Sequence, residues 1–104
     1  MSEKLSYDYT IDRIIHEPAR LMITAYLYVV DSADYLFLMQ NTGLTWGNLS
    51  SHLSKLEDTG YVEITKEFVQ KKPHTMARLT LPGRTAFDGH HRQMKALFED
   101  LPEA

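Results

Sequence analysis

A glycine and a threonine that interrupt a helical pattern constrain the fold of this chain more than any other feature. Residues 34–42 are predicted to form a short helix that ends at Gly43, because glycine readily adopts the left-handed conformation wanted there. Thr45 can cap a second helix over residues 46–58, in which Leu49, Leu53 and Leu56 recur at helical spacing. Gly60 ends this helix. Two helices joined by so tight a turn are typical of a helix-turn-helix.

The sequence changes its period after Gly60. Residues 61–68 are rich in β-branched and aromatic side chains that alternate with polar ones, which predicts a strand. Residues 69–74 form a basic connector that contains a proline, and residues 75–79 are predicted to return as a second strand. We expect the tip of this hairpin to carry Lys71, Lys72 and His74.

Helices are predicted on both sides of this unit. The first covers residues 11–30, with Pro18 in a first turn, Ile14 and Ile15 in a short turn before it, and an apolar face of Leu21, Met22, Ala25 and Val29. Asp31 and Ser32 are expected to end it and to cap the next helix. Thr80 can cap a last helix that runs to about residue 100, with Pro82 in its first turn.

Three helices, a hairpin and a further helix predict a mainly α, α+β fold: a winged helix-turn-helix with an added C-terminal helix. We expect one domain over residues 1–104, with the helix-turn-helix at about 34–59, the wing at about 61–79 and the last helix at about 81–100. The polar start is unlike a signal peptide and no apolar run is long enough for a membrane span, so a cytoplasmic protein without a membrane partner is expected.

Charge is distributed unevenly along the chain. The net charge is −3, which by itself argues against a nucleic-acid partner. Residues 44–84 nevertheless carry six basic and four acidic side chains, a balance of +2, whereas both flanking segments are acidic. Because phosphates respond to the local field, an acidic protein with a basic face can bind DNA.

The segment from Thr42 to Val62 resembles the recognition segment of small winged-helix transcription regulators related to the MarR and ArsR families. The resemblance continues through residues 72–75 of the hairpin and through Leu79, Thr80, Gly83, Arg84, Ala86 and Phe87 at the last helix. It reaches back to His16, Pro18, Arg20 and Leu21, leaving out about the first ten residues. It implies a transcription regulator that binds the major groove of double-stranded DNA as a homodimer.

The helix over residues 46–58 is expected to be the recognition helix. Its leucines point inward, so its polar residues face outward, and no acid occurs from Thr45 to Lys55. Asparagine can pair with adenine, and lysines suit phosphates. The expected DNA-binding residues are Thr45, Trp46, Asn48, Ser51, His52 and Lys55 in the helix-turn-helix, and Lys66, Lys71, Lys72, His74 and Arg78 in the hairpin. The alternative interpretation is an ordinary solvated helix face and a charged hairpin tip.

Three residues near this surface, Trp46, Gly47 and Arg78, allow two interpretations each. Trp46 could contact a thymine methyl group or a sugar, or it could cover the edge of the core. Gly47, inside a helix, would be explained by close approach of the preceding helix or of a phosphate. Arg78 could point toward DNA or pair with a carboxylate such as Glu63 or Glu67, and Arg84 is interpreted as structural.

Metal binding and catalysis are not expected. The chain has no cysteine, and His90 and His91 are neighbours that diverge by about 100° on a helix, without a ligand three or four residues later. There is no glycine-rich phosphate loop, and Ser50, Ser51 and Ser54 do not face His52 as a catalytic pair would. The sequence therefore predicts a protein that is not an enzyme and has no metal site or cofactor.

Apolar residues in the last helix predict a dimer. The stripe Phe87, Met94, Leu97, Phe98 and Leu101 extends beyond the hairpin, and Tyr7, Tyr9 and Ile11 add apolar surface. Exposed apolar stripes usually mark interfaces, so a two-fold homodimer is expected, although the residues could simply complete the core. A small-molecule effector is compatible with the resemblance, but no residue indicates its site. The competing function is a winged helix that contacts proteins and no DNA.

Overall fold

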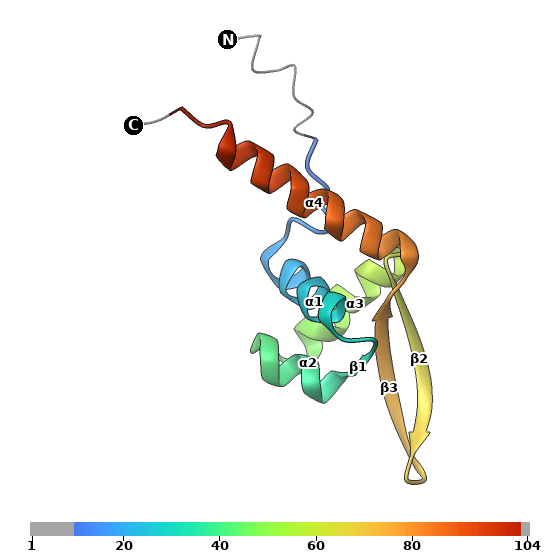
Figure 1. The fold of residues 1–104 in the computed structure, drawn as a ribbon. Helices are drawn as coiled ribbons and strands as arrows, with labels where there is room; N and C mark the ends of the chain where they lie inside the picture. Colours follow the sequence, from blue (N-terminus) through green and yellow to red (C-terminus); the bar gives the residue numbers. More distant parts are fainter. Residues whose placement is uncertain (1–9, 103–104) are drawn as a thin grey trace.

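Four α-helices and a small antiparallel sheet make up the described part of the chain, residues 10–102, in the computed structural model (Figure 1). The elements follow in the order α1 (Pro18–Val29), β1 (Ala33–Asp34), α2 (Tyr35–Thr42), α3 (Trp46–Thr59), β2 (Val62–Val69), β3 (Lys72–Leu79) and α4 (Leu81–Glu99). This order confirms the predicted winged helix-turn-helix. None of the described helices has the length and apolar composition to cross a membrane.

The ends of α2 and α3 follow the predicted signals. Gly43 and Gly60 adopt φ values of 75° and 89°, and the Asn48 amide donates to the Thr45 hydroxyl over 3.2 Å. The predicted cap of α2 was wrong: Asp34, and not Asp31 or Ser32, accepts a hydrogen bond from the Phe37 amide. Ala33 and Asp34 first pair with β3, which keeps the backbone extended up to the residue that caps the helix.

The first helix is shorter than predicted and buries a different face. It begins at Pro18 after Glu17, whose side chain accepts from the Arg20 amide, and residues 11–17 lie outside it. Its buried residues are Ala19, Ile23, Thr24 and Leu27, whereas Met22 and Val29 of the predicted face are exposed. Nearly every position of this helix is apolar, so periodicity alone could not select the inner stripe.

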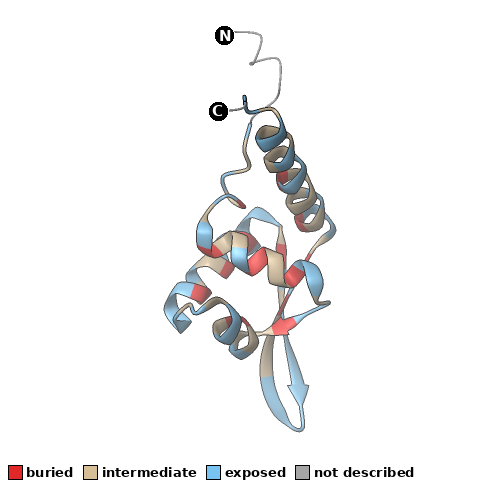
Figure 2. Cartoon of the chain, turned by 60° about the vertical axis from the view of Figure 1, so that its left-hand side comes forward, coloured by how far each residue is buried: buried red, intermediate tan, exposed pale blue. Residues whose placement is uncertain are grey.

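The core lies between α1, α2, α3 and the base of the sheet, and it does not extend into the hairpin (Figure 2). Its fully enclosed members include Ile23, Leu27, Leu38, Leu49, Leu53 and Leu56. The predicted inward leucines of α3 are therefore confirmed. Because all three are buried, the opposite face of this helix is available to solvent.

The sheet has the order β1-β3-β2, and its third strand was not predicted. β1 pairs only with Met76 and Ala77, so the rest of the hairpin is a two-stranded ribbon that projects from the body (Figure 1). The predicted connector 69–74 is also corrected, because Lys72, Pro73 and His74 belong to β3 and the turn consists of Gln70 and Lys71. Pro73 is tolerated there because β3 is an edge strand beyond the reach of β1.

The start of α4 is fixed to the junction between α3 and β2. The Thr80 amide donates to the Tyr61 carbonyl over 3.0 Å, and the Thr80 hydroxyl donates to the Gly60 carbonyl over 2.6 Å. Gly83 is buried against the same backbone. From this anchor α4 runs past the other helices, and its far end stands clear of them (Figure 1).

The segment before α1 connects distant parts of the fold. The Tyr61 hydroxyl donates to the Asp12 carboxylate over 2.6 Å, and this hydrogen bond, with burial, raises the pKa of Tyr61 to about 12. His16 Nδ1 lies 2.8 Å from Nε2 of His90, a buried residue of α4. Gln93 donates to the Thr10 carbonyl over 2.7 Å. The segment therefore packs on both α4 and the root of β2.

The histidine contact predicts that the fold is less stable in mild acid. Burial, followed by the charge of His16, lowers the pKa of His90 below 6.5; His91 acts in the same direction and the Asp12 carboxylate opposes them. The unfolded chain therefore binds this proton more readily than the folded one. The free energy of unfolding, measured by urea denaturation, should decrease as the pH falls below about 6.5 and level off below the folded-state pKa.

A neighbouring histidine provides the control for this pH dependence. His91→Gln removes an exposed imidazole whose charge has the smallest of these effects on His90, so most of the pH dependence should remain, whereas His90→Gln should flatten the profile. A wild-type stability that is constant between about pH 8 and 5, or that rises toward acid, would contradict the assignment.

Candidate nucleic-acid interface

The outward face of α3 is polar and free of acids along its first ten residues. Asn48, Ser51 and Lys55 are exposed and lie on the side of the helix opposite the buried leucines. Their spacing of three and four residues places them on one strip. The acids of this helix, Glu57 and Asp58, come only in its last turn. A surface of this composition suits a negatively charged polymer with hydrogen-bonding groups along its grooves.

His52 lies apart from this strip, in contrast to the prediction that it faces outward. Its Nδ1 lies 3.2 Å from Nη1 of Arg20 and 3.7 Å from Oε1 of Glu17, both near the start of α1. Arg20 is held in turn by the Ile14 carbonyl, to which its Nε donates over 2.7 Å. His52 therefore joins α3 to α1, with part of its ring still accessible.

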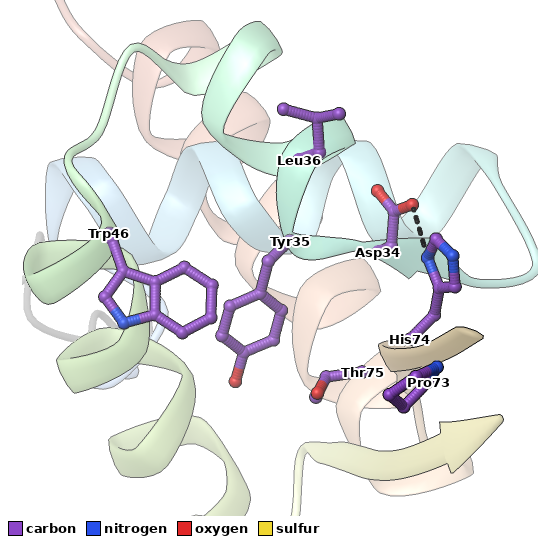
Figure 3. A pocket seen from close by; sticks show the side chains of 7 residues that line it. All are labelled: Asp34, Tyr35, Leu36, Trp46, Pro73, His74 and Thr75. Atoms are coloured by element: carbon purple, nitrogen blue, oxygen red, sulfur yellow. Dashed lines mark ion pairs between the residues drawn. The ribbon is translucent and has the colours of Figure 1, made fainter. Parts of the chain in front are cut away.

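Trp46 packs on a neighbouring helix and stays largely exposed, and its contact with DNA stays a prediction. Its ring packs on Tyr35 of α2 with centroids 4.7 Å apart, yet 57% of the residue is exposed. Figure 3 shows the two rings side by side at the edge of an open pocket of about 250 Å³ between the starts of α2 and α3 and the hairpin. Trp46 is therefore positioned by Tyr35 and presents its free side to solvent.

Gly47 faces open space. A Cβ built at this position meets nothing within 4 Å, so close packing of the preceding helix does not explain the glycine. Of the two explanations offered by the sequence, approach of a phosphate or another external group is the one still open. Gly47 lies one residue before Asn48, at the exposed start of the same helix.

The acids of the hairpin lie on one face of the ribbon. Val62 and Ile64 of β2 point toward the core, and by alternation Lys66 and Phe68 lie on the same face. Glu63 and Glu67, the acids of the hairpin, lie on the other face. Lys71 occupies the turn and Lys72 the first position of β3, so both cations stand at the far end of the ribbon.

Two predicted contact residues are engaged within the chain. Arg78 Nε donates to Glu63 over 3.0 Å, so it pairs with a carboxylate on the outer face of the hairpin. His74 pairs with Glu67 two residues along β3 from Lys72, and its Nδ1 is 3.6 Å from the Asp34 carboxylate (Figure 3). Arg84 donates to the Tyr28 carbonyl over 3.1 Å and lies over the Tyr28 ring, in agreement with the structural role predicted for it.

The predicted dimer residues differ in exposure. Phe87 packs on Tyr28 with ring centroids 5.0 Å apart, which makes it part of the contact between α4 and α1. Met94 and Leu97 are partly exposed, whereas Phe98 and Leu101 are 68% and 54% exposed. Tyr7 and Tyr9 lie outside the described residues. The free apolar surface is thus concentrated at the far end of α4.

The contact between two histidines was not predicted from the sequence, in which no histidines are spaced so that their side chains would meet. His16 and His90 are 74 residues apart, and only the packing of α4 on the N-terminal segment brings them together. Within residues 10–102, no group of three or more histidine, aspartate and glutamate side chains is arranged to hold a metal ion.

Comparison with known proteins assigns this architecture. The family model for the winged helix DNA-binding domain matches residues 19–98, which include α1, the helix-turn-helix, the hairpin and almost all of α4. The chain belongs to the winged helix DNA-binding domain family. In this winged-helix protein α3 is the second helix of the helix-turn-helix and the β2–β3 hairpin is the wing.

The chain is similar to two proteins of about its own length and to a longer transcriptional regulator. An uncharacterized protein of Methanocaldococcus jannaschii is 32% identical over 89 residues, which cover 86% of this chain and 97% of that protein. The structure of a transcriptional regulator homologue from Pyrococcus horikoshii OT3 matches with a TM-score of 0.83 and 29% identity, covering 95% of this chain and 99% of that one. A MarR-family transcriptional regulator from Silicibacter pomeroyi has a TM-score of 0.66 at 19% identity, covering 97% and 66% of the two chains. The winged-helix chain therefore falls among DNA-binding transcriptional regulators.

Three residues that shape the winged-helix surface were not identified from the sequence. Arg20 orients His52, Tyr35 supports Trp46, and Phe68 is exposed near the tip of the wing. The first two act through contacts between helices, for which the sequence holds no local signal. Phe68 could have been found, because a large apolar residue next to a predicted hairpin tip has no core to enter.

Proposed function

We propose that this winged-helix protein is a sequence-specific transcription regulator that binds double-stranded DNA as a homodimer. The recognition helix α3 enters the major groove, and the wing contacts the phosphate backbone or the adjacent minor groove. The observation that carries this proposal is the acid-free strip of Asn48, Ser51 and Lys55 on the free face of α3. Membership in a DNA-binding family supports it.

The proposed contacts divide into two groups by chemistry. Asn48 and Ser51 provide hydrogen bonds suited to base edges, with Trp46 and Thr45 beside them at the start of α3. Lys55, Lys66, Lys71 and Lys72 provide charges suited to phosphates. His52, His74 and Arg78 support the surface through contacts inside the chain, and DNA binding by them stays a prediction. Base contacts should determine sequence, and phosphate contacts should determine position.

The exposed end of α4 supports the proposed dimer. Phe98 and Leu101 are apolar and exposed, and Met94 and Leu97 adjoin them on the same helix. Packing this surface against a second copy would bury it and set two recognition helices on one duplex. Such a dimer should prefer a pseudo-palindrome whose half-sites are separated by about 34 Å, or a multiple of it.

Variants of the two groups should change binding in different ways. Asn48→Ala should cost about 1–3 kcal/mol on the preferred site and much less on random duplex, because it removes a base contact. Lys71→Ala with Lys72→Ala should weaken binding to both duplexes and lower the salt slope by about one unit per lost phosphate contact. The preferred site is obtained by selection from a random DNA pool, and affinities are measured over a salt series.

Residues away from the proposed surface provide matched controls. Asn41→Ala on α2 and Lys95→Ala on α4 remove an exposed amide and an exposed charge, and neither should alter affinity appreciably. If the lysine variant loses sequence preference and Asn48→Ala loses only overall affinity, the roles of α3 and the wing are reversed. If the wild type binds no duplex even at low salt, the protein-contact function replaces the proposal.

Three further expectations belong to this proposal. A regulator of this kind acts in the cytoplasm on chromosomal DNA, and the whole chain forms one domain. A small-molecule effector stays a prediction without a named site.

A further inference from the structure

The tip of the wing carries an apolar pair that the fold of the chain does not use. Phe68 of β2 is paired directly with Pro73 of β3, so the two side chains lie next to each other on one face of the ribbon. Phe68 is 76% exposed. The same face of β2 reaches the core only at Ile64, four residues earlier, with Lys66 between them. A phenylalanine in this position costs solubility and contributes nothing to the core of the chain.

The ribbon ends in the tightest connection that a hairpin can have. Gln70 and Lys71 form the turn, and both have positive φ values, 53° and 68°. Positive φ at both central residues is the mark of the type I′ turn, which asparagine and glycine normally occupy. The tip is therefore only two strands wide, and it projects well away from the helices (Figure 1). The minor groove of B-DNA is about 6 Å wide, so a side chain at such a tip can reach into it even though the whole ribbon cannot.

Charge around the pair indicates which partner it meets. Lys66 lies on the same face two residues from Phe68, Lys71 is in the turn, and Lys72 follows on the opposite face, paired with Val69, so cations flank Phe68 along the ribbon. The acids Glu63 and Glu67 lie on the opposite face of the ribbon. An apolar side chain with lysines before and after it along the ribbon is complementary to a polyanion with an apolar interior, which is what stacked base pairs between two phosphate backbones present.

We propose that the wing tip is a minor-groove wedge in which Phe68, backed by Pro73, inserts between two base pairs while the lysines hold the flanking phosphates. The wedge rests on the proposed function, because it requires that the recognition helix dock in the adjacent major groove. Insertion unstacks one base step and kinks the duplex by roughly 20–90° toward the major groove. Flexible pyrimidine–purine steps should therefore be preferred at the base step where Phe68 inserts, although no polar side chain of the wing forms a hydrogen bond to a base there.

The test compares Phe68→Ala with Val69→Ala, which shortens the next residue of the same tip but on the other face. The probe is a duplex of about 40 base pairs that carries the selected site, end-labelled for energy transfer, with 2-aminopurine at successive flanking positions. Wild type should bring the ends closer and brighten 2-aminopurine at one step per half-site. Phe68→Ala should abolish both signals and bind about tenfold more weakly. Val69→Ala and Phe68→Leu should keep both signals.

Each contrary outcome is separable from failure of the proposed function. Wild type that binds the duplex without bending it or brightening 2-aminopurine overturns the wedge and leaves DNA binding intact. The wedge is also overturned if Phe68→Ala and Val69→Ala lose the bending and the 2-aminopurine signal to the same extent. The face of the ribbon on which Phe68 lies would then have no special role. Wild type that binds no duplex overturns the proposed function itself. Thermal melting of each variant without DNA should match wild type, because both side chains are exposed.

Discussion

Gly83→Ala should lower the melting temperature by roughly 15 °C, corresponding to a loss of about 3 kcal/mol in the free energy of unfolding. An added Cβ at this position would overlap the Tyr61 carbonyl oxygen and lie 2.9 Å from the Tyr61 carbonyl carbon. Both atoms are backbone, and the same carbonyl accepts the Thr80 amide. Neither can move without releasing the start of α4 from the junction between α3 and β2.

Gly89→Ala is the matched control on the same helix. A Cβ at Gly89 meets nothing within 4 Å, and alanine is the better helix former, so this variant should gain about 0.5–1 kcal/mol. Circular dichroism melts at one fixed protein concentration compare the two variants with wild type. A Gly83→Ala protein that melts within a few degrees of wild type would show that α4 is not docked on Tyr61 as described.

Phe98→Asp combined with Leu101→Asp should convert a dimer into a monomer and weaken specific DNA binding roughly 100-fold. Both side chains are exposed in the single chain, so the aspartates should not disturb its core. They would place charges in an interface that excludes water. Sedimentation at micromolar concentration should show twice the 12.0 kDa chain mass for wild type and the mass of one chain for the variant.

Leu81→Asp tests whether any exposed leucine of α4 has this effect. Leu81 is 78% exposed in the first turn of the helix, far from Phe98 and Leu101 along the chain. Aspartate is favourable at a helix N-terminus, so this variant should fold and remain dimeric. A wild-type protein that sediments as a monomer at micromolar concentration would refute the dimer. If Leu81→Asp also sediments as a monomer, the interface would lie elsewhere on α4.

Strong local signals made the helix-turn-helix predictable. Gly43 and Gly60 adopt the backbone conformation that their type favours, and Thr45 and Thr80 accept the amide hydrogen bonds expected of caps. Each signal acts within three residues, so one sequence suffices to locate it. The two-residue strand β1 has no such signal, because it exists only through pairing with β3.

The candidate site was predictable in composition and less so in geometry. The polar residues of α3 could be placed outward because the leucines fix the inner face. The contact of His52 with Arg20 spans 32 residues and depends on how α1 crosses α3, which no local pattern encodes. The same holds for His74, whose contact with Asp34 depends on how the hairpin lies against the start of α2. DNA binding by each of these residues stays a prediction.

The attachment of residues 10–17 sets the smallest piece of this chain that can be expected to fold. The family match begins at residue 19, after Asp12 and His16, yet Asp12 receives the Tyr61 hydroxyl and His16 meets His90. The Ile14 carbonyl also holds Arg20, which in turn holds His52 on the recognition helix. A fragment cut at the family boundary would leave partly buried polar groups of β2, α4 and α1 without partners. An expression fragment for structural work should therefore start at or before Thr10.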